Sequence, residues 1–154
     1  MVTIREGDLL ASACEVICHQ TNCKGAMGRG VAACIRSTYP EAYQALRDRF
    51  ERGDAMVGEV DFVPTVRDGV LRYIVNCYGQ NEYFPRDIVH TDYLGLRRCF
   101  QKIKFEFKDK DVTIGFPYNI GCGLAGGDWD VVSKIIEEEF GGKEWRVELW
   151  RLQS

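Results

Sequence analysis

The chain has 154 residues, 45% of them hydrophobic and 28% charged, with a formal net charge of −3 at pH 7. No apolar run approaches the roughly 20 residues that a membrane-spanning helix needs, and the negative charge argues against a broad nucleic-acid or membrane surface. We therefore expect one soluble domain over residues 1–154, cytoplasmic and monomeric, with an ordinary buried core.

Strands and helices alternate along the sequence, apart from one hairpin in the middle. Short apolar or alternating runs predict strands at residues 2–6, 16–19, 57–63, 70–76, 112–116 and 145–152. Helical spacing of apolar residues predicts helices at residues 30–50, interrupted at Pro40, and at 93–107 and 129–140. Thr91 is the expected N-cap of the second, and Gly141 ends the last. This order predicts an α/β fold, a three-layer α/β/α sandwich with a mixed central sheet.

Two glycine-rich loops, NCKGAMGRG (22–30) and GCGLAGG (121–127), each follow a predicted strand and precede a predicted helix. Ligands of α/β sheets bind at such positions. Glycine permits backbone angles closed to other residues, and amides near a helix N-terminus attract anions. The pair of loops predicts a ligand with two phosphate groups, although each loop can also be an ordinary turn.

The first loop also contains the C-x5-R spacing of cysteine phosphatases, from Cys23 to Arg29. In that chemistry a thiolate attacks phosphorus while loop amides and the arginine hold the phosphate oxygens. Tyrosine phosphatases have His before the nucleophile and Ser or Thr after the arginine, whereas this chain has Asn22 and Gly30, and no W-P-D stretch occurs. A helix N-terminus can lower a thiol pKa, so Cys23 stays a candidate nucleophile.

The seven cysteines mostly lie among apolar residues, which indicates reduced, buried thiols rather than a disulfide framework. Cys14, Cys18, His19 and Cys23 are close in sequence, but no C-x2-C pair occurs. Adjacent residues of a strand also point to opposite faces of the sheet. We expect neither a metal site nor a cofactor.

The stretches GDLL (7–10), CHQTNCKGAMGRGVA (18–32) and FPYNIGCGLAGGDW (116–129) together resemble a macrodomain. The resemblance covers essentially the whole chain. It is strongest to the branch that contains small ADP-ribose-1″-phosphate phosphatases and terminal ADP-ribose–protein hydrolases. It implies an ADP-ribose cleft in an α/β/α sandwich, with one glycine loop on each side of the ligand's diphosphate.

The resemblance also implies binding residues. It places Asp8 and Leu9 at the adenine, Trp150 beside the adenine, and Asn22 at the distal ribose. The residues that it implies for the two phosphate loops are Gly28, Gly30 and Val31, and Gly121, Cys122, Gly123, Leu124 and Ala125. Three assignments have structural alternatives, because Asp8 can cap a turn, Asn22 can stabilise its own turn and Trp150 can lie in the core.

The sequence leaves catalysis open. One hydrolase group of the resembling branch uses a lysine just after the strand at residues 70–76, with an aspartate in the second phosphate loop. This chain has NCYGQ (76–80) and Ala125 there, so that covalent lysine mechanism is not supported. His19, which resembles a histidine of the phosphatase members, can exchange a proton near neutral pH, and Asp128 can orient a water. His19 can equally be a buried strand residue, and Asp128 the N-cap of the following helix.

Two functions therefore remain open. The first is a hydrolase that releases ADP-ribose from a 1″-phosphate or from an ADP-ribosyl conjugate. The second is a non-catalytic reader that binds free or terminal ADP-ribose. Both functions use the same binding residues, and His19 and Asp128 distinguish them.

Overall fold

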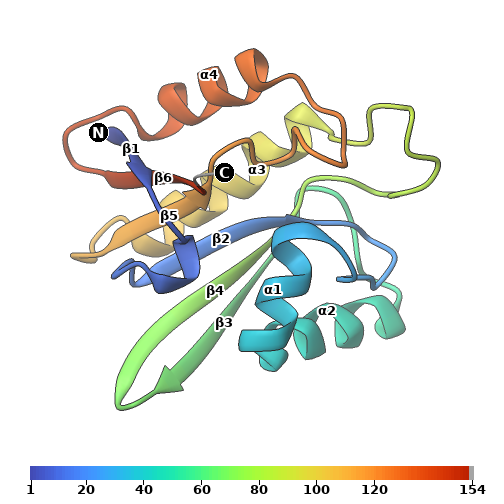
Figure 1. Cartoon of the computed structure of the whole chain (residues 1–154), viewed down its shortest axis with the longest axis horizontal. Helices are drawn as coiled ribbons and strands as arrows, with labels where there is room; N and C mark the ends of the chain where they lie inside the picture. Colours follow the sequence, from blue (N-terminus) through green and yellow to red (C-terminus); the bar gives the residue numbers. More distant parts are fainter. Residues whose placement is uncertain (153–154) are drawn as a thin grey trace.

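A six-stranded sheet forms the centre of the computed structural model, which describes residues 1–152 (Figure 1). The strands are β1 (Val2–Glu6), β2 (Val16–Thr21), β3 (Val60–Arg67), β4 (Val70–Tyr78), β5 (Thr113–Pro117) and β6 (Arg146–Arg151). Their spatial order is β1-β6-β5-β2-β4-β3, and every neighbouring pair is parallel except the β3–β4 hairpin. The predicted mixed sheet is confirmed.

Four helices cover the two faces of this sheet (Figure 1). They are α1 (Gly30–Thr38), α2 (Pro40–Arg52), α3 (Tyr93–Phe107) and α4 (Trp129–Phe140), and a short 3-10 helix, η1 (Leu9–Ala11), follows β1. Helices α1 and α2 lie on one face, and α3 and α4 lie on the other. The fold is therefore the predicted three-layer α/β/α sandwich. None of the helices among residues 1–152 is long and apolar enough to cross a bilayer.

Strand β2 shows why both faces are covered, because its residues are buried on either side. Ile17 packs with Ile35 of α1 and Ala42 of α2, whereas Cys18 packs with Phe100 of α3. A parallel strand that is apolar on both faces has to lie between two layers of helices. This burial fixes β2 at the centre of the sheet, and its carboxyl end leads directly into the first glycine loop.

Several predicted boundaries were wrong by one to four residues, among them the ends of β2, β3 and β4, and two of the differences have a clear local cause. The N-cap of α3 is Asp92, whose side chain accepts a hydrogen bond from the Gly95 amide at 2.8 Å, whereas the Thr91 hydroxyl donates to the Gly121 carbonyl. Strand β3 begins at Val60 rather than residue 57, because Gly58 has a φ of 95° and the chain turns there.

The carboxyl ends of β2, β4 and β5 lie at one edge of the sheet, because these strands are parallel. The segments that follow them, at residues 22–29, 79–92 and 118–128, therefore emerge side by side. This edge is where ligands of open α/β sheets bind.

Candidate functional site

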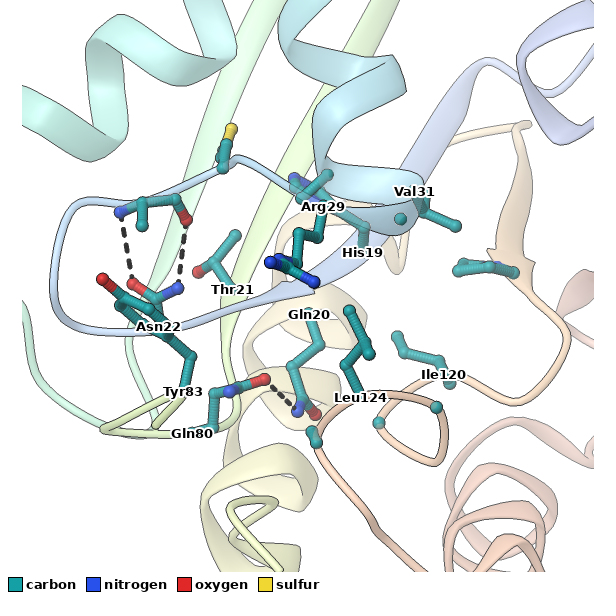
Figure 2. Close-up of a pocket in the computed structure, with 18 of the residues that line it drawn as sticks. His19, Gln20, Thr21, Asn22, Arg29, Val31, Gln80, Tyr83, Ile120 and Leu124 are labelled. Atoms are coloured by element: carbon teal, nitrogen blue, oxygen red, sulfur yellow. Dashed lines mark hydrogen bonds between the residues drawn. The ribbon is translucent and has the colours of Figure 1, made fainter. Parts of the chain in front are cut away.

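A cavity of about 670 Å³ lies beyond these strand ends (Figure 2). The first glycine loop and the start of α1 form one wall, and the second glycine loop forms the opposite wall. Figure 2 shows Arg29 and Leu124 projecting toward each other from these two walls. The segment after β4 forms a third side, with Gln80 at its base.

The first glycine loop leaves a row of backbone amides available. Within residues 1–152, the amides of residues 28–32 donate no hydrogen bond to the protein, and the N-cap residue Arg29 makes no side-chain capping bond. A Cβ added to Gly28 or to Gly30 would meet no atom within 4 Å, and Gly30 has a φ of 60°. The partial positive charge of the α1 N-terminus is therefore open to the cavity.

The second glycine loop has the same property. The amides of Gly123, Leu124 and Ala125 make no hydrogen bond within the described chain, and all three residues line the cavity. The Gly127 amide donates to the Gly121 carbonyl at 2.9 Å and closes the loop on itself. Two rows of free amides thus lie on opposite sides of one cavity, as the two-phosphate prediction requires.

The charges around the cavity also favour an anion. None of its lining residues, all of them in the described part of the chain, is Asp or Glu, whereas Arg29 and Arg86 both line it. Neither arginine forms an ion pair within residues 1–152. In a protein of net charge −3 this local excess of positive charge draws negative ligands toward the site.

Asn22 lines the cavity and also holds the first loop in shape. Its Oδ1 accepts hydrogen bonds from the amides of Lys24 (2.9 Å) and Ala26 (3.3 Å), and its Nδ2 donates to the Ala26 carbonyl at 3.0 Å. Asn22 therefore stabilises its own turn, which was the structural alternative to a ligand contact. One Nδ2 hydrogen remains for a ligand, because the amide carries two.

Cys23 points away from the cavity and into a small core cluster with Met27, Leu46 and Tyr78. Only 4% of the residue is exposed, its thiol donates to the Gln80 carbonyl, and burial raises its pKa to about 11. A nucleophilic cysteine needs the opposite, an accessible thiol with a lowered pKa. The geometry therefore contradicts the cysteine phosphatase alternative.

The three residues expected at the adenine lie together but outside the cavity. Asp8 is exposed and caps η1 by accepting from the Leu10 amide at 2.9 Å, while Leu9 and Trp150 pack in the core cluster on the α1–α2 side. The Trp150 carbonyl accepts from the Tyr118 amide at 2.8 Å, and Tyr118 lines the cavity. This group is therefore next to the cavity wall, and its role at adenine stays a prediction.

Two further predicted residues do not line the cavity. The Cys122 thiol donates to the Ile120 carbonyl, and burial raises its pKa to about 11. Asp128 is the N-cap of α4 and accepts from the Asp130 amide at 2.9 Å. The capping role accounts for Asp128, and its place outside the cavity gives no support to a catalytic role.

His19 lines the cavity but is only 1% exposed. Its Nε2 lies 2.7 Å from Oδ1 of Asn76 on the neighbouring strand. Burial lowers its pKa to about 4, against the opposing effects of Asn76 and the Asp61 charge. The ring is therefore neutral at pH 7 and cannot act as a general acid there.

The remaining predicted residues, Gly28, Gly30, Val31, Gly121, Gly123, Leu124 and Ala125, all line the cavity. Sequence reasoning missed the wall made by the segment after β4, which contributes Gln80, Tyr83, Phe84 and Arg86. The signal was the length of this segment between a strand and a helix, because long ordered connections are commonly functional. All seven cysteines are free thiols and five are buried, and residues 1–152 contain no group of three His, Cys, Asp or Glu residues that could hold a metal ion.

The α/β/α sandwich holds two rows of free amides around one carboxylate-free cavity, and this geometry suits the two phosphates of a diphosphate ligand. The Macro domain family model matches residues 18–136, and the chain belongs to this family. The DNA ADP-ribosyl glycohydrolase of Mycobacterium tuberculosis is 26% identical over 143 residues, which are 91% of this chain and 39% of that relative. The ADP-ribose glycohydrolase OARD1 of Bos taurus is 27% identical over 154 residues, 98% of this chain and 91% of OARD1.

The fold has close counterparts among solved structures. The macrodomain of Mycobacterium tuberculosis DarG superposes with a TM-score of 0.85 at 22% identity, covering 100% of this chain and 99% of that one. At this identity the likeness concerns the fold. The chain spans about two fifths of the length of the mycobacterial glycohydrolase that it matches, 39%.

Proposed function

We propose that this protein binds ADP-ribose and hydrolyses its bond to an acceptor in ADP-ribosylated conjugates. The observation that carries the proposal is the pair of amide rows, at residues 28–32 and 123–125, on opposite walls of a cavity without carboxylates. Such rows suit the two phosphates of ADP-ribose. Two relatives that carry the name of ADP-ribosyl or ADP-ribose glycohydrolases support the choice of reaction.

The ligand's orientation follows from the residues on either side of the amide rows. Asn22 offers its free Nδ2 hydrogen to the distal ribose, at the end of the cavity that His19 lines. The adenine then extends past Tyr118 toward Asp8 and Trp150, which lie beyond that wall. The Asp8 carboxylate can accept from the adenine amino group in this orientation.

The reaction adds one water across the bond between C1″ of the distal ribose and the acceptor. The hydroxyl goes to C1″ and the proton to the acceptor atom that leaves. The chain supplies binding and orientation for this step through the loop amides. Because Gln80 follows β4 where one hydrolase group has a lysine, a covalent lysine intermediate is not part of the proposal.

The rim of the cavity favours a nucleic-acid acceptor. Tyr83 and Phe84 are 52% and 72% exposed, and both line the cavity together with Arg29 and Arg86. Exposed aromatic rings beside free guanidinium groups can stack on bases and contact phosphates. The alternative substrates are ADP-ribosylated protein and ADP-ribose-1″-phosphate.

A non-catalytic reader of ADP-ribose is the second candidate, and one observation favours it. Gln80, at the base of the cavity, is a neutral amide whose Oε1 accepts from Gln20 Nε2 at 2.8 Å. Neither side chain can form a covalent intermediate. A protein that lacks the lysine after β4 and has Ala125 in place of the aspartate of the second loop can bind the ligand without turning it over.

The test is to incubate the protein with three substrates and to follow the released product. These are ADP-ribosylated single-stranded DNA, ADP-ribosylated protein and ADP-ribose-1″-phosphate. Release of ADP-ribose from the DNA substrate, faster than from the other two, is the expected result. Binding of all ligands without product makes the protein a reader.

A further inference from the structure

A buried chain of polar side chains leads from α2 to the cavity. His19 of β2 and Asn76 of β4 are partners across the parallel strand pair, and their side chains meet at 2.7 Å between Nε2 and Oδ1. They are 1% and 0% exposed. Polar side chains buried this deeply need a specific set of partners.

The orientation of the Asn76 amide is fixed by its own donors. Its Nδ2 donates to the Ala42 carbonyl at 2.9 Å and to Oδ2 of Asp61 at 3.1 Å, which uses both hydrogens. Rotating the amide by 180° would turn its oxygen toward a carbonyl and a carboxylate, both of which only accept. The Asn76 oxygen therefore faces His19.

Asp61 is itself held in place. Its Oδ1 accepts from Nε of Arg49 at 2.8 Å, and its Oδ2 accepts from the Tyr78 hydroxyl at 2.6 Å. The Asp61 side chain is 9% exposed and that of Arg49 is 17% exposed. The carboxylate is thus paired with a cation and cannot turn away from Asn76 without losing these bonds.

The Asn76 oxygen decides the tautomer of His19. Because this oxygen only accepts, Nε2 of His19 carries the ring proton, and Nδ1 keeps its lone pair. Within residues 1–152, Nδ1 is buried and makes no hydrogen bond, although His19 lines the cavity. An acceptor left in this state gains free energy when a ligand brings it a donor.

We propose that Asn76, held by Asp61, is a positioning residue that keeps His19 in its Nε2–H tautomer, so that Nδ1 accepts a hydrogen bond from a hydroxyl of the distal ribose. This inference rests on the proposed function, since it assigns a contact within the same cavity. The low pKa of the His19 ring, about 4, agrees with an acceptor that stays neutral.

Nitrogen NMR of the histidine rings tests the proposal in the intact protein. The free protein should show His19 as the Nε2–H tautomer, and saturation with ADP-ribose should shift its Nδ1 resonance in the direction of a hydrogen-bonded nitrogen. An Nδ1–H tautomer in the free protein, or an Nδ1 resonance unchanged at saturation, overturns the proposal. A parent protein that fails to bind ADP-ribose removes the proposed function, whereas binding with an unchanged resonance overturns only this inference.

A variant pair separates positioning from a general loss of buried hydrogen bonds. Asn76→Ala should give a mixture of His19 tautomers and weaken ADP-ribose at least ten-fold. The matched control is Thr65→Val on β3, since Thr65 is 2% exposed, donates to the Arg72 carbonyl at 2.7 Å and does not line the cavity. The control should bind like the parent. A folded Asn76→Ala protein with parental affinity contradicts the positioning role, and if that variant does not fold, the NMR of the parent protein decides.

Discussion

Gly28 and Gly30 both face open space at the first amide row, but they differ in backbone angle. Gly30 has a φ of 60°, which side-chain-bearing residues adopt at a cost, whereas Gly28 does not have a positive φ. Loss of binding in a Gly28 variant therefore reports on contact with the ligand. Loss of binding in a Gly30 variant also includes a contribution from backbone strain.

Gly28→Glu should abolish ADP-ribose binding with little change in melting temperature. The new carboxylate enters the cavity beside the diphosphate, and its Cβ meets no atom within 4 Å in the free protein. Calorimetry and thermal unfolding check both parts. Gly30→Glu should also abolish binding, but it adds backbone strain. Its matched control for that strain is Gly69→Glu in the β3–β4 turn, where φ is 77° and the Cβ site is also open. If Gly28→Glu binds ADP-ribose normally, the first loop does not hold a phosphate.

Cys23→Ser should leave binding and any hydrolysis largely intact. The Cys23 thiol is buried and donates to the Gln80 carbonyl, a bond that a serine hydroxyl can also make. Exposed Cys34 gives the control variant Cys34→Ser. A loss of several orders of magnitude in rate for Cys23→Ser alone, with a phosphocysteine trapped in the parent enzyme, would restore the cysteine phosphatase hypothesis.

His19 should make the protein less stable as the pH falls from about 6.5 toward 4. Its pKa is lowered in the folded state from 6.5 to about 4, so the unfolded chain binds this proton more readily. The stabilisation is complete above pH 6.5 and is lost as the pH falls to the folded-state value. The lowering of the His19 pKa to about 4 corresponds to about 3 kcal/mol of stability at neutral pH.

Urea unfolding between pH 7.5 and 4 measures this slope in the parent and in His19→Gln. The chain has only two histidines, so His90→Gln is the matched control. Only His19→Gln should flatten the profile between pH 6.5 and 4. Equal slopes in all three proteins would show that His19 titrates normally in the fold.

At the scale of elements, the sequence predicted the layers and the order of strands and helices because apolar periodicity reports burial directly. The split at Pro40 and the end of α4 at Gly141 are confirmed for local reasons, the geometry of proline and of a helix terminus. The cap of α3 was predicted one residue too early. Thr91 and Asp92 are both good caps, and only the contact of Thr91 with the second glycine loop decides between them.

The two residues at the start of α3 should therefore have separable effects. Asp92→Ala should lower the free energy of unfolding by about 1 kcal/mol, the usual cost of a lost N-cap, without changing ADP-ribose affinity. Thr91→Val should instead weaken binding, because the Thr91 hydroxyl links Gln20 Nε2 to the Gly121 carbonyl of the second loop. Denaturant unfolding and calorimetry on both variants check this, and the reverse pattern would mean that Thr91 serves the helix.

At the scale of the whole molecule, the sequence predicted the edge of the sheet where the site lies but not all of its walls. Glycine loops are visible in a sequence because the residue type is itself the signal. The rim at Tyr83 and Phe84 carries no such pattern, and the Asn76–His19 contact joins strands that are 57 residues apart in sequence. Contacts of this kind depend on strand order, which periodicity does not determine.

The net charge of the whole molecule is negative, whereas the residues that line the cavity carry an excess of positive charge. The net charge of −3 repels anions at a distance, while Arg29, Arg86 and the two amide rows attract them locally. We therefore expect tight binding only for a ligand that contacts both amide rows. ADP-ribose has two phosphates, one for each row, whereas AMP has a single phosphate and should bind much more weakly.

A calorimetric titration of the protein with ADP-ribose, with AMP as the comparison, tests the assignment of this cavity. We expect a 1:1 complex with a dissociation constant in the micromolar range, about −8 kcal/mol, and an AMP affinity at least ten-fold lower. No heat and no competition at millimolar ADP-ribose would show that this cavity is not an ADP-ribose site.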